Sequence, residues 1–134
     1  MQVKEIKIED LDPKQFIKQK INEISSAVGS DTAINALSGG VDSSAVTMLG
    51  YRALGGRLKT YFIDSGLMRQ DEPQQIVSWF KELGIPVEVL DAKEQFFNAL
   101  KGITDPEEKR EAITQTFYKD VFGQLVRERS QSLF

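Results

Sequence analysis

The 134-residue chain contains neither cysteine nor histidine. Without cysteine it has no disulfide framework, no cysteine-based metal site and no thiol nucleophile. Without histidine it lacks the usual general base and cannot form a Ser-His-Asp triad. Any chemistry must therefore rest on phosphate binding, a metal ion and the positioning of substrates, and we assign no catalytic side chain.

Excess charge and long apolar runs are scarce as well. The net charge of −3 and the pI near 5.1 give no electrostatic case for a nucleic-acid partner. No apolar run approaches the roughly 20 residues that span a bilayer, so we expect no membrane contact. The polar opening Met1–Glu5 does not resemble a signal peptide, which favours the cytoplasm. The composition suits one soluble globular domain over residues 1–134, or part of one.

A loop rich in glycine and serine follows the apolar run 33–37. An apolar strand, a glycine loop and a helix in this order bring backbone N–H groups to a helix N-terminus, which favours phosphate binding. Gly39 and Gly40 allow positive φ and a close approach of the main chain to an anion. A carboxylate beside a phosphate, here Asp42, indicates an intervening cation such as Mg²⁺. The loop residues are Ser38, Gly39, Gly40, Val41, Asp42, Ser43 and Ser44.

This loop matches neither of the two common phosphate-binding patterns. No lysine follows the glycines, as the Walker A motif requires, and the G-x-G-x-x-G spacing is missing. It resembles instead the SGGxDS pattern of the PP-loop in the ATP pyrophosphatase superfamily. Members of that superfamily cleave ATP between the α- and β-phosphates and adenylate a substrate oxygen. A glycine-rich turn that binds nothing is the alternative, and the density of glycine, serine and aspartate after a strand disfavours it.

Apolar periodicity divides the chain into helices that alternate with short strands. Asp12-Pro13 and Asp105-Pro106 each supply an N-cap aspartate and a proline at the first helical position. The alternation indicates an α/β fold, a doubly wound parallel sheet with helices on both faces. We expect helices over 13–28, 43–54, 73–83, 93–100 and 106–129, and strands over 33–37, 58–63 and 86–90.

The same periodicity predicts which helix faces pack inward. In the first helix these residues are Phe16, Ile17, Ile21, Ile24 and Val28, and in the second Ala45, Val46, Leu49 and Ala53. Ligands of such sheets bind at the carboxyl ends of the strands. The loop 38–44, residues 64–66 and Asp91 all lie at those ends.

Three strands are few for a doubly wound sheet, in which the first strand is normally internal. Without a fourth strand, the first would be an exposed edge with unpaired backbone groups. We therefore expect an N-terminal portion of a longer protein, with a naturally short protein as the alternative.

Four residues at the end of the second strand or just after it are further ligand candidates. Asp64 could organise a metal ion or a ribose hydroxyl, or cap its own loop. Ile63 could offer main-chain groups to an adenine edge while its side chain joins the core. Leu67, with Met68, could cover the adenine and Arg69 could meet phosphate, or the segment could be a hydrophobic staple beside a solvated arginine.

Two other charged sites favour structural roles. Asp91 is expected to cap the helix that begins near Lys93. The run 107–111 is expected to be a solvated first helical turn with i,i+4 pairing.

Several separate stretches together resemble the ATP pyrophosphatase domain of the GMP synthetase family, over about residues 12–127. The segments Asp64-Ser65-Gly66-Leu67-Met68-Arg69 and Thr104-Asp105-Pro106-Glu107-Glu108-Lys109-Arg110 are more specific to that family than the PP-loop. The resemblance extends to residues 36–44, 62–69, 91–96 and 99–110.

The resemblance implies the adenine nucleotide alpha hydrolase-like fold, with ATP and Mg²⁺ as cofactors. In that family ATP adenylates the O2 of xanthosine monophosphate (XMP), and ammonia displaces AMP to give GMP. Residues 38–44 would then bind the phosphates, Asp42 would hold Mg²⁺, and Ile63 and Leu67 would lie near adenine.

The resemblance also implies partners. The segment 12–17 is similar to the two-subunit arrangement, in which a separate glutaminase supplies ammonia. The family's dimerisation domain implies a homodimer of the full-length protein. Two alternatives stay open: another PP-loop enzyme, of the NAD synthetase or tRNA-thiolating type, and a non-catalytic nucleotide-binding module.

Overall fold

The computed structural model describes residue 5 and residues 7–131 of the chain. The other opening residues, on which the expectation of no signal peptide depends, lie outside this part. A short 3-10 turn, Ile8–Asp10, precedes the first helix. None of the helices in the described ranges combines the length and the apolar character needed to cross a membrane.

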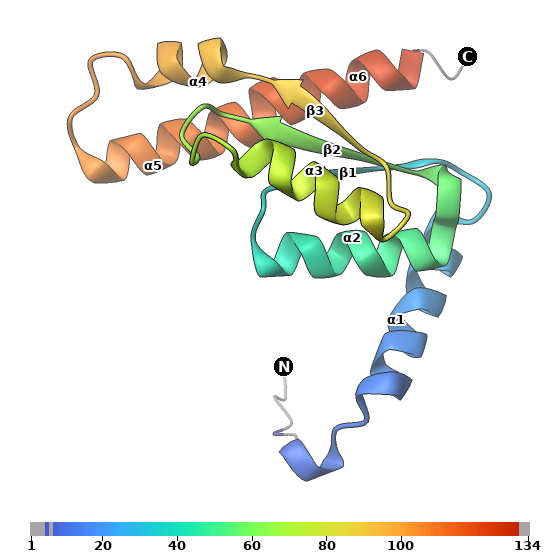
Figure 1. Cartoon of the computed structure of the whole chain (residues 1–134). Coiled ribbons are helices and arrows are strands. Elements are labelled where there is room, and N and C mark those ends of the chain that lie inside the picture. Colours follow the sequence, from blue (N-terminus) through green and yellow to red (C-terminus); the bar gives the residue numbers. More distant parts are fainter. Residues whose placement is uncertain (1–4, 6, 132–134) are drawn as a thin grey trace.

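A parallel sheet of three strands forms the centre of the fold (Figure 1). Its strands are β1 (Ala33–Leu37), β2 (Leu58–Asp64) and β3 (Val87–Asp91), in the order β1-β2-β3. The predicted strands and their parallel arrangement are confirmed, with β2 and β3 each ending one residue later than expected. Within the described sheet β1 is an edge strand, the consequence expected of a missing fourth strand.

Two helices cover one face of the sheet: α2 (Val41–Leu54) and α3 (Glu72–Glu82). Their core joins Leu37 and Phe62 of the sheet to two buried side chains of α3 and to Ile85. Tyr51 of α2 packs against this cluster. We call this cluster the α2–α3 core, and it includes Leu37, the last residue of β1.

The opposite face carries α4 (Lys93–Leu100), α5 (Pro106–Gln115), a π-helical segment (Thr116–Phe122) and α6 (Gly123–Gln131). The core on this side, which we call the α4–α6 core, contains Ile63, Ala92, Phe96 and Val121. Helices on both faces are therefore confirmed.

The expectation of one uninterrupted α-helix over 106–129 is wrong, because a π-helical segment interrupts it. Thr116 and Val121 are five residues apart and both buried, which the wider π turn permits on one face. The Thr116 hydroxyl donates to the Ala112 carbonyl at 2.7 Å, in competition with regular α-helical bonding.

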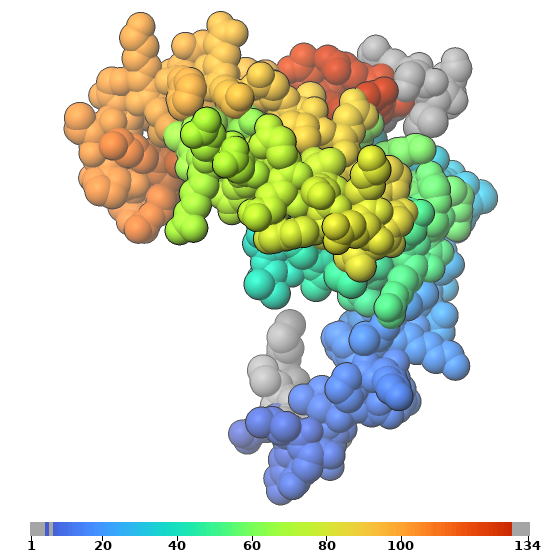
Figure 2. Space-filling view, viewed as in Figure 1, coloured from blue at the N-terminus to red at the C-terminus, as the bar shows by residue number. Residues whose placement is uncertain are grey.

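Helix α1 (Pro13–Val28) projects away from the rest of the chain, as Figures 1 and 2 show. Asp12 caps it as predicted, by accepting the Gln15 N–H at 3.2 Å. None of its residues is buried, and Phe16 is 49% exposed. The predicted inward face of α1 is therefore confirmed in part: the helix contacts α2, and four of the five predicted residues are half-buried, namely Ile17, Ile21, Ile24 and Val28.

The inward face of α2 also differs from the prediction. Its buried residues are Thr47, Gly50 and Leu54, whereas Val46 is 55% exposed and Ala45 is exposed as well. Gly50 decides this orientation, because a Cβ there would lie 3.0 Å from Cδ2 of Leu58. The helix therefore turns Gly50 toward β2 and Val46 outward, whereas Leu49 and Ala53 of the predicted face are half-buried.

Candidate functional site

The glycine loop, residues 38–44, joins the carboxyl end of β1 to α2, which begins at Val41 and not near Ser43 as predicted. Gly40 is the N-cap, so no side chain caps this helix, and the first intrahelical bond runs from the Ser44 N–H to the Gly40 carbonyl at 3.1 Å. The N–H groups of residues 41–43 consequently have no intrahelical partner. By contrast, Asp12 and Asp105 cap α1 and α5. The start of α2 is thus free to bind an anion.

Serine hydroxyls hold the two ends of the glycine loop together. The Ser38 N–H donates to Oγ of Ser43 at 3.2 Å, and the two hydroxyl oxygens lie 3.0 Å apart. Oγ of Ser44 donates to the Gly40 carbonyl at 2.8 Å. The hydroxyls fix the loop's shape before any ligand is bound.

The two loop glycines have different roles. Gly39 has a φ of 87°, and a Cβ there would lie 2.9 Å from Cδ1 of Ile76, so both conformation and space require glycine. Gly40 has a φ of −80°, so the expectation of positive φ is wrong at this position. Its Cβ would make only an ordinary contact, 3.7 Å from Oγ of Ser38. Close approach to a ligand remains the predicted reason for Gly40.

A polar pair behind the loop was missed at the sequence level. Nδ2 of Asn35 on β1 donates to Oγ1 of Thr47 at 2.6 Å, and Thr47 donates to the Ser43 carbonyl at 2.7 Å. Thr47 is fully buried, so these bonds satisfy its hydroxyl away from water. Asn35 is a polar residue inside the apolar run 33–37, and this departure from the apolar pattern was the sequence signal that could have indicated the pair.

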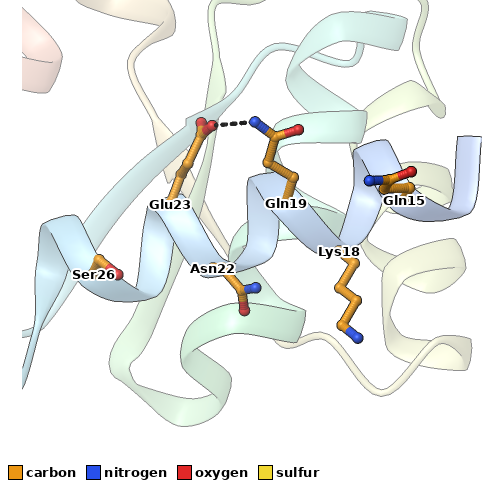
Figure 3. Close-up of a pocket in the computed structure, with 6 residues that line it drawn as sticks. All are labelled: Gln15, Lys18, Gln19, Asn22, Glu23 and Ser26. Carbon is orange, nitrogen blue, oxygen red and sulfur yellow. Dashed lines mark hydrogen bonds between the residues drawn. The ribbon is translucent and has the colours of Figure 1, made fainter. Parts of the chain in front are cut away.

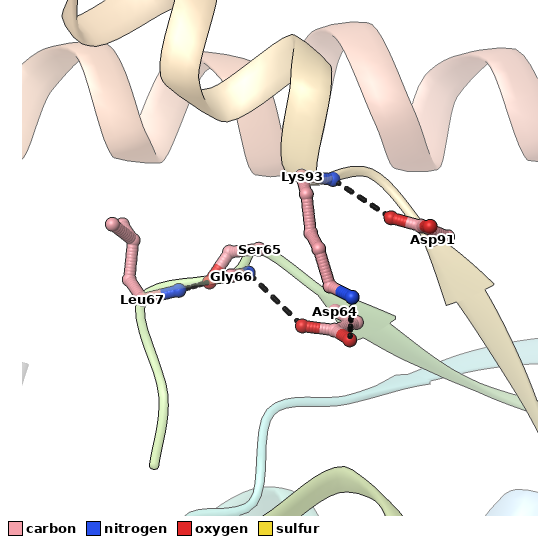
Figure 4. Close-up of polar contacts among 6 residues, drawn as sticks. All are labelled: Asp64, Ser65, Gly66, Leu67, Asp91 and Lys93. Carbon is pink, nitrogen blue, oxygen red and sulfur yellow. Dashed lines mark hydrogen bonds and ion pairs between the residues drawn. The ribbon is translucent and has the colours of Figure 1, made fainter. Parts of the chain in front are cut away.

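The ends of β2 and β3 meet at a second polar cluster (Figure 4). Asp64 is buried, and its Oδ1 accepts the Gly66 N–H at 2.9 Å, while Nζ of Lys93 lies 3.6 Å from its Oδ2. Asp64 therefore caps its own loop, and its roles toward a metal or ribose stay predictions. The N-cap position of α4 is Ala92, and Asp91, one residue earlier, accepts the Lys93 N–H at 3.1 Å, so it supports the start of this helix as expected.

The residues around this cluster divide between core and surface. The Ile63 side chain lies in the α4–α6 core, and Met68 packs against the α2–α3 core. Leu67 is 48% exposed and Arg69 is exposed, with its N–H donating to Oε2 of Glu72 at 3.2 Å. The structure thus separates the apolar pair: Met68 supports the loop, and Leu67 and Arg69 stay available to a ligand.

The sequence candidate for metal binding is Asp42, an exposed residue in the first turn of α2. Across residues 5 and 7–131, no group of three or more acidic, histidine or cysteine side chains could hold a metal. A single carboxylate nevertheless fits Mg²⁺, which commonly binds through one or two carboxylates together with water and substrate phosphates.

The charged run 107–111 is solvated, as predicted. Asp105 caps α5 by accepting the Glu108 N–H at 3.0 Å. Arg110 pairs with Glu107 at 2.6 Å, three residues away and not the expected four, with both side chains about three-quarters exposed.

A hollow of about 670 Å³ lies along α1 (Figure 3). One helix supplies its whole lining of polar side chains, and among the residues drawn Gln19 bonds Glu23 at 3.4 Å. The lining residues are Gln15, Lys18, Gln19, Asn22, Glu23 and Ser26. None of the sequence candidates contributes to it, so it is the solvated face of α1 and not the nucleotide site.

A family model described as NAD synthase matches residues 11–120, which include the glycine loop, the Asn35–Thr47 pair and the polar cluster around Asp64. The chain belongs to this family. The solved NH3-dependent NAD synthetase from Campylobacter jejuni covers 76% of this chain and 47% of its own, with a TM-score of 0.62 and 17% identity. For NMN synthetase from Francisella tularensis the TM-score is 0.64, with 19% identity over 87% of this chain and 52% of that one. Both confirm the predicted adenine nucleotide alpha hydrolase-like fold.

Sequence similarity is much higher to GMP synthases. One subunit of the glutamine-hydrolyzing GMP synthase from Pyrococcus abyssi is 45% identical over 86% of this chain and 37% of its own length. The same subunit from Methanocaldococcus jannaschii is 46% identical over 87% of this chain and 38% of its length. Glutamine-hydrolyzing GMP synthase from Thermosipho melanesiensis is 50% identical over 81% of this chain and 21% of its length. The chain therefore spans well under half of these relatives.

Proposed function

We propose that this chain is the ATP-binding part of a GMP synthase-type ligase. The observation that carries the proposal is the N-terminus of α2, which has no side-chain cap and lies at the carboxyl end of β1. It belongs to a region that is about 45–50% identical to GMP synthases. The structural likeness to NAD synthetases supports the fold, and the proposed substrate rests on the sequence similarity to GMP synthases.

The glycine loop would hold the ATP phosphates. The N–H groups of residues 41–43 would bind the anion, and Gly40 would let the phosphate approach the main chain. The hydroxyls of Ser38, Ser43 and Ser44 would add donors by turning from their bonds within the loop to the phosphate. Asp42 would bind Mg²⁺, which when present neutralises phosphate charge and favours departure of pyrophosphate. The adenosine would lie toward Ile63 and Leu67.

The reaction would proceed in two displacements. The O2 of XMP forms a bond to the α-phosphorus of ATP, and the bond to the bridging oxygen breaks, so that pyrophosphate leaves with the electron pair. Ammonia then attacks C2 of the adenylated base and AMP leaves, which gives GMP. This chain's residues would contribute by binding and orienting ATP, with Asp64 and Arg69 as ribose or phosphate contacts.

The whole protein would need an ammonia source. Two of the relatives are named as a single subunit of a glutamine-hydrolyzing enzyme, which supports a separate glutaminase as the partner. We further propose a homodimer for the full-length protein, acting in the cytoplasm on XMP, without nucleic acid or membrane partners.

Another PP-loop enzyme, of the NAD synthetase type, is the second candidate because the matching family model carries that description. The 17% identity to a solved NAD synthetase, against 45% or more to GMP synthases, favours the first proposal. A tRNA-thiolating enzyme and a non-catalytic nucleotide-binding module share the glycine loop, but no observation favours them.

Calorimetry with ATP and Mg²⁺, with GTP and AMP as controls, tests the nucleotide site in this chain. Binding selective for ATP supports the proposal, and equal binding of GTP contradicts it. ATP–pyrophosphate exchange then tests the acceptor: stimulation by XMP supports a GMP synthase, and stimulation by a deamidated dinucleotide supports the NAD synthetase type.

A further inference from the structure

The linker segment, residues 65–69, connects β2 to the start of α3 and is held near both of its ends by close contacts. Gly66 has a φ of 74°, and a Cβ there would lie 2.8 Å from Cζ of Phe97 and 3.0 Å from Cγ of Lys93. At the other end, Cε of Met68 lies 3.3 Å from the Cβ position of Gly39. The segment therefore bridges the start of α4 and the glycine loop.

Lys93 makes three contacts at the first of these ends. Its N–H donates to Oδ1 of Asp91, which fixes its backbone at the end of β3. Its stem packs against Gly66, and its ammonium group lies 3.6 Å from Oδ2 of Asp64. Figure 4 shows the side chain running from the start of α4 down to the end of β2.

The charge of Lys93 stabilises a carboxylate that has little access to water. The side chain of Asp64 is 11% exposed, whereas that of Lys93 is 50% exposed. Removal of the cation would leave the buried carboxylate without its ion-pair partner, at a cost larger than that of losing a surface ion pair. Because Asp64 also accepts the Gly66 N–H, any relaxation of its side chain would loosen the linker segment.

We propose that Lys93 is a positioning residue of the nucleotide site: through Asp64 and Gly66 it fixes the half of the linker segment that carries Leu67. The other half is anchored independently, because Met68 packs against the α2–α3 core. The consequence for nucleotide binding rests on the proposed function, in which Leu67 faces adenosine. The positioning of Gly66 by Lys93 does not depend on that function.

The test uses the full chain with Lys93→Met, which keeps the stem and removes the charge, and Lys93→Arg, which restores a cation. Lys59→Met is the matched control, because Lys59 is an exposed lysine near the opposite end of β2. Amide hydrogen exchange at Gly66, measured by NMR, reports positioning without any ligand. Calorimetry with ATP–Mg²⁺ and with inorganic pyrophosphate reports its effect on the site.

In Lys93→Met we expect Gly66 exchange and the ATP dissociation constant each to rise about three- to tenfold, the range for an ion pair with one buried partner. Pyrophosphate binding should change less, and Lys93→Arg and Lys59→Met should behave like the parent. An unchanged Gly66 exchange rate overturns the proposal. Equal weakening of pyrophosphate would instead assign Lys93 to direct phosphate contact, and tighter ATP binding would show that it obstructs the site. If the parent chain binds no ATP, the proposed function fails, while Gly66 exchange still decides the positioning claim.

Discussion

Asn35 on β1 donates a hydrogen bond to Thr47 on α2, and the two residues flank the glycine loop in sequence. The bond spans 2.6 Å and joins the strand before the loop to the helix after it. Because the Thr47 hydroxyl donates a second hydrogen bond to the Ser43 carbonyl, these side chains connect the first turn of α2 to the sheet.

Thr47→Val should reduce the free energy of unfolding by about 1–3 kcal/mol, since it keeps the side-chain shape and leaves the Asn35 amide without its acceptor. Urea denaturation followed by circular dichroism measures this change. Thr114→Val, at an exposed position of α5, is the control and should stay within about 0.5 kcal/mol of the parent. Equal effects of the two variants would contradict a special role for the buried pair.

Asp42→Asn should remove the Mg²⁺-dependent part of ATP binding and leave the fold intact, because Asp42 is exposed and the neutral amide is a poor magnesium ligand. The measurement is calorimetry of ATP with Mg²⁺ and with EDTA. Asp31→Asn, at the amino end of β1, is the matched control. Undiminished Mg²⁺ dependence in Asp42→Asn would rule out the proposed metal role.

The two loop glycines should respond differently to substitution. Gly39→Ala should destabilise the chain by about 1–3 kcal/mol, because a side chain at positive φ is strained and Ile76 occupies the space. Gly40→Val should fold normally, since its φ is ordinary and only Ser38 lies near the new Cβ, but should lose ATP binding by obstructing the phosphate. Thermal unfolding and calorimetry separate the two effects. Normal ATP affinity in Gly40→Val would argue against phosphate binding at this loop.

Asp105→Ala should cost about 1 kcal/mol of stability, because it removes the side-chain acceptor for the Glu108 N–H at the start of α5. Asp120→Ala, at an exposed position of the π-helical segment, serves as the comparison. The midpoint of urea unfolding reports both. No difference between the two variants would mean that α5 does not depend on its cap.

Local patterns predicted much of this fold because the signals are local. The aspartate–proline pairs mark the starts of α1 and α5, and the strands were found from short apolar runs between turns. The orientation of α2 could not be found in this way. It depends on Leu58 from a different element, which fits against Gly50 and turns Val46 outward.

The α/β alternation and the glycine loop after β1 could be read from residues adjacent in the chain. The polar residues were expected at one sheet edge because each follows a strand, and parallel strands end at the same edge. Three contacts follow from no local pattern and came from the folded arrangement alone: Asn35 with Thr47, Lys93 with Asp64, and Met68 with Gly39 of the glycine loop. These pairs are 12, 29 and 29 residues apart, and only packing of the strands and helices brings them together.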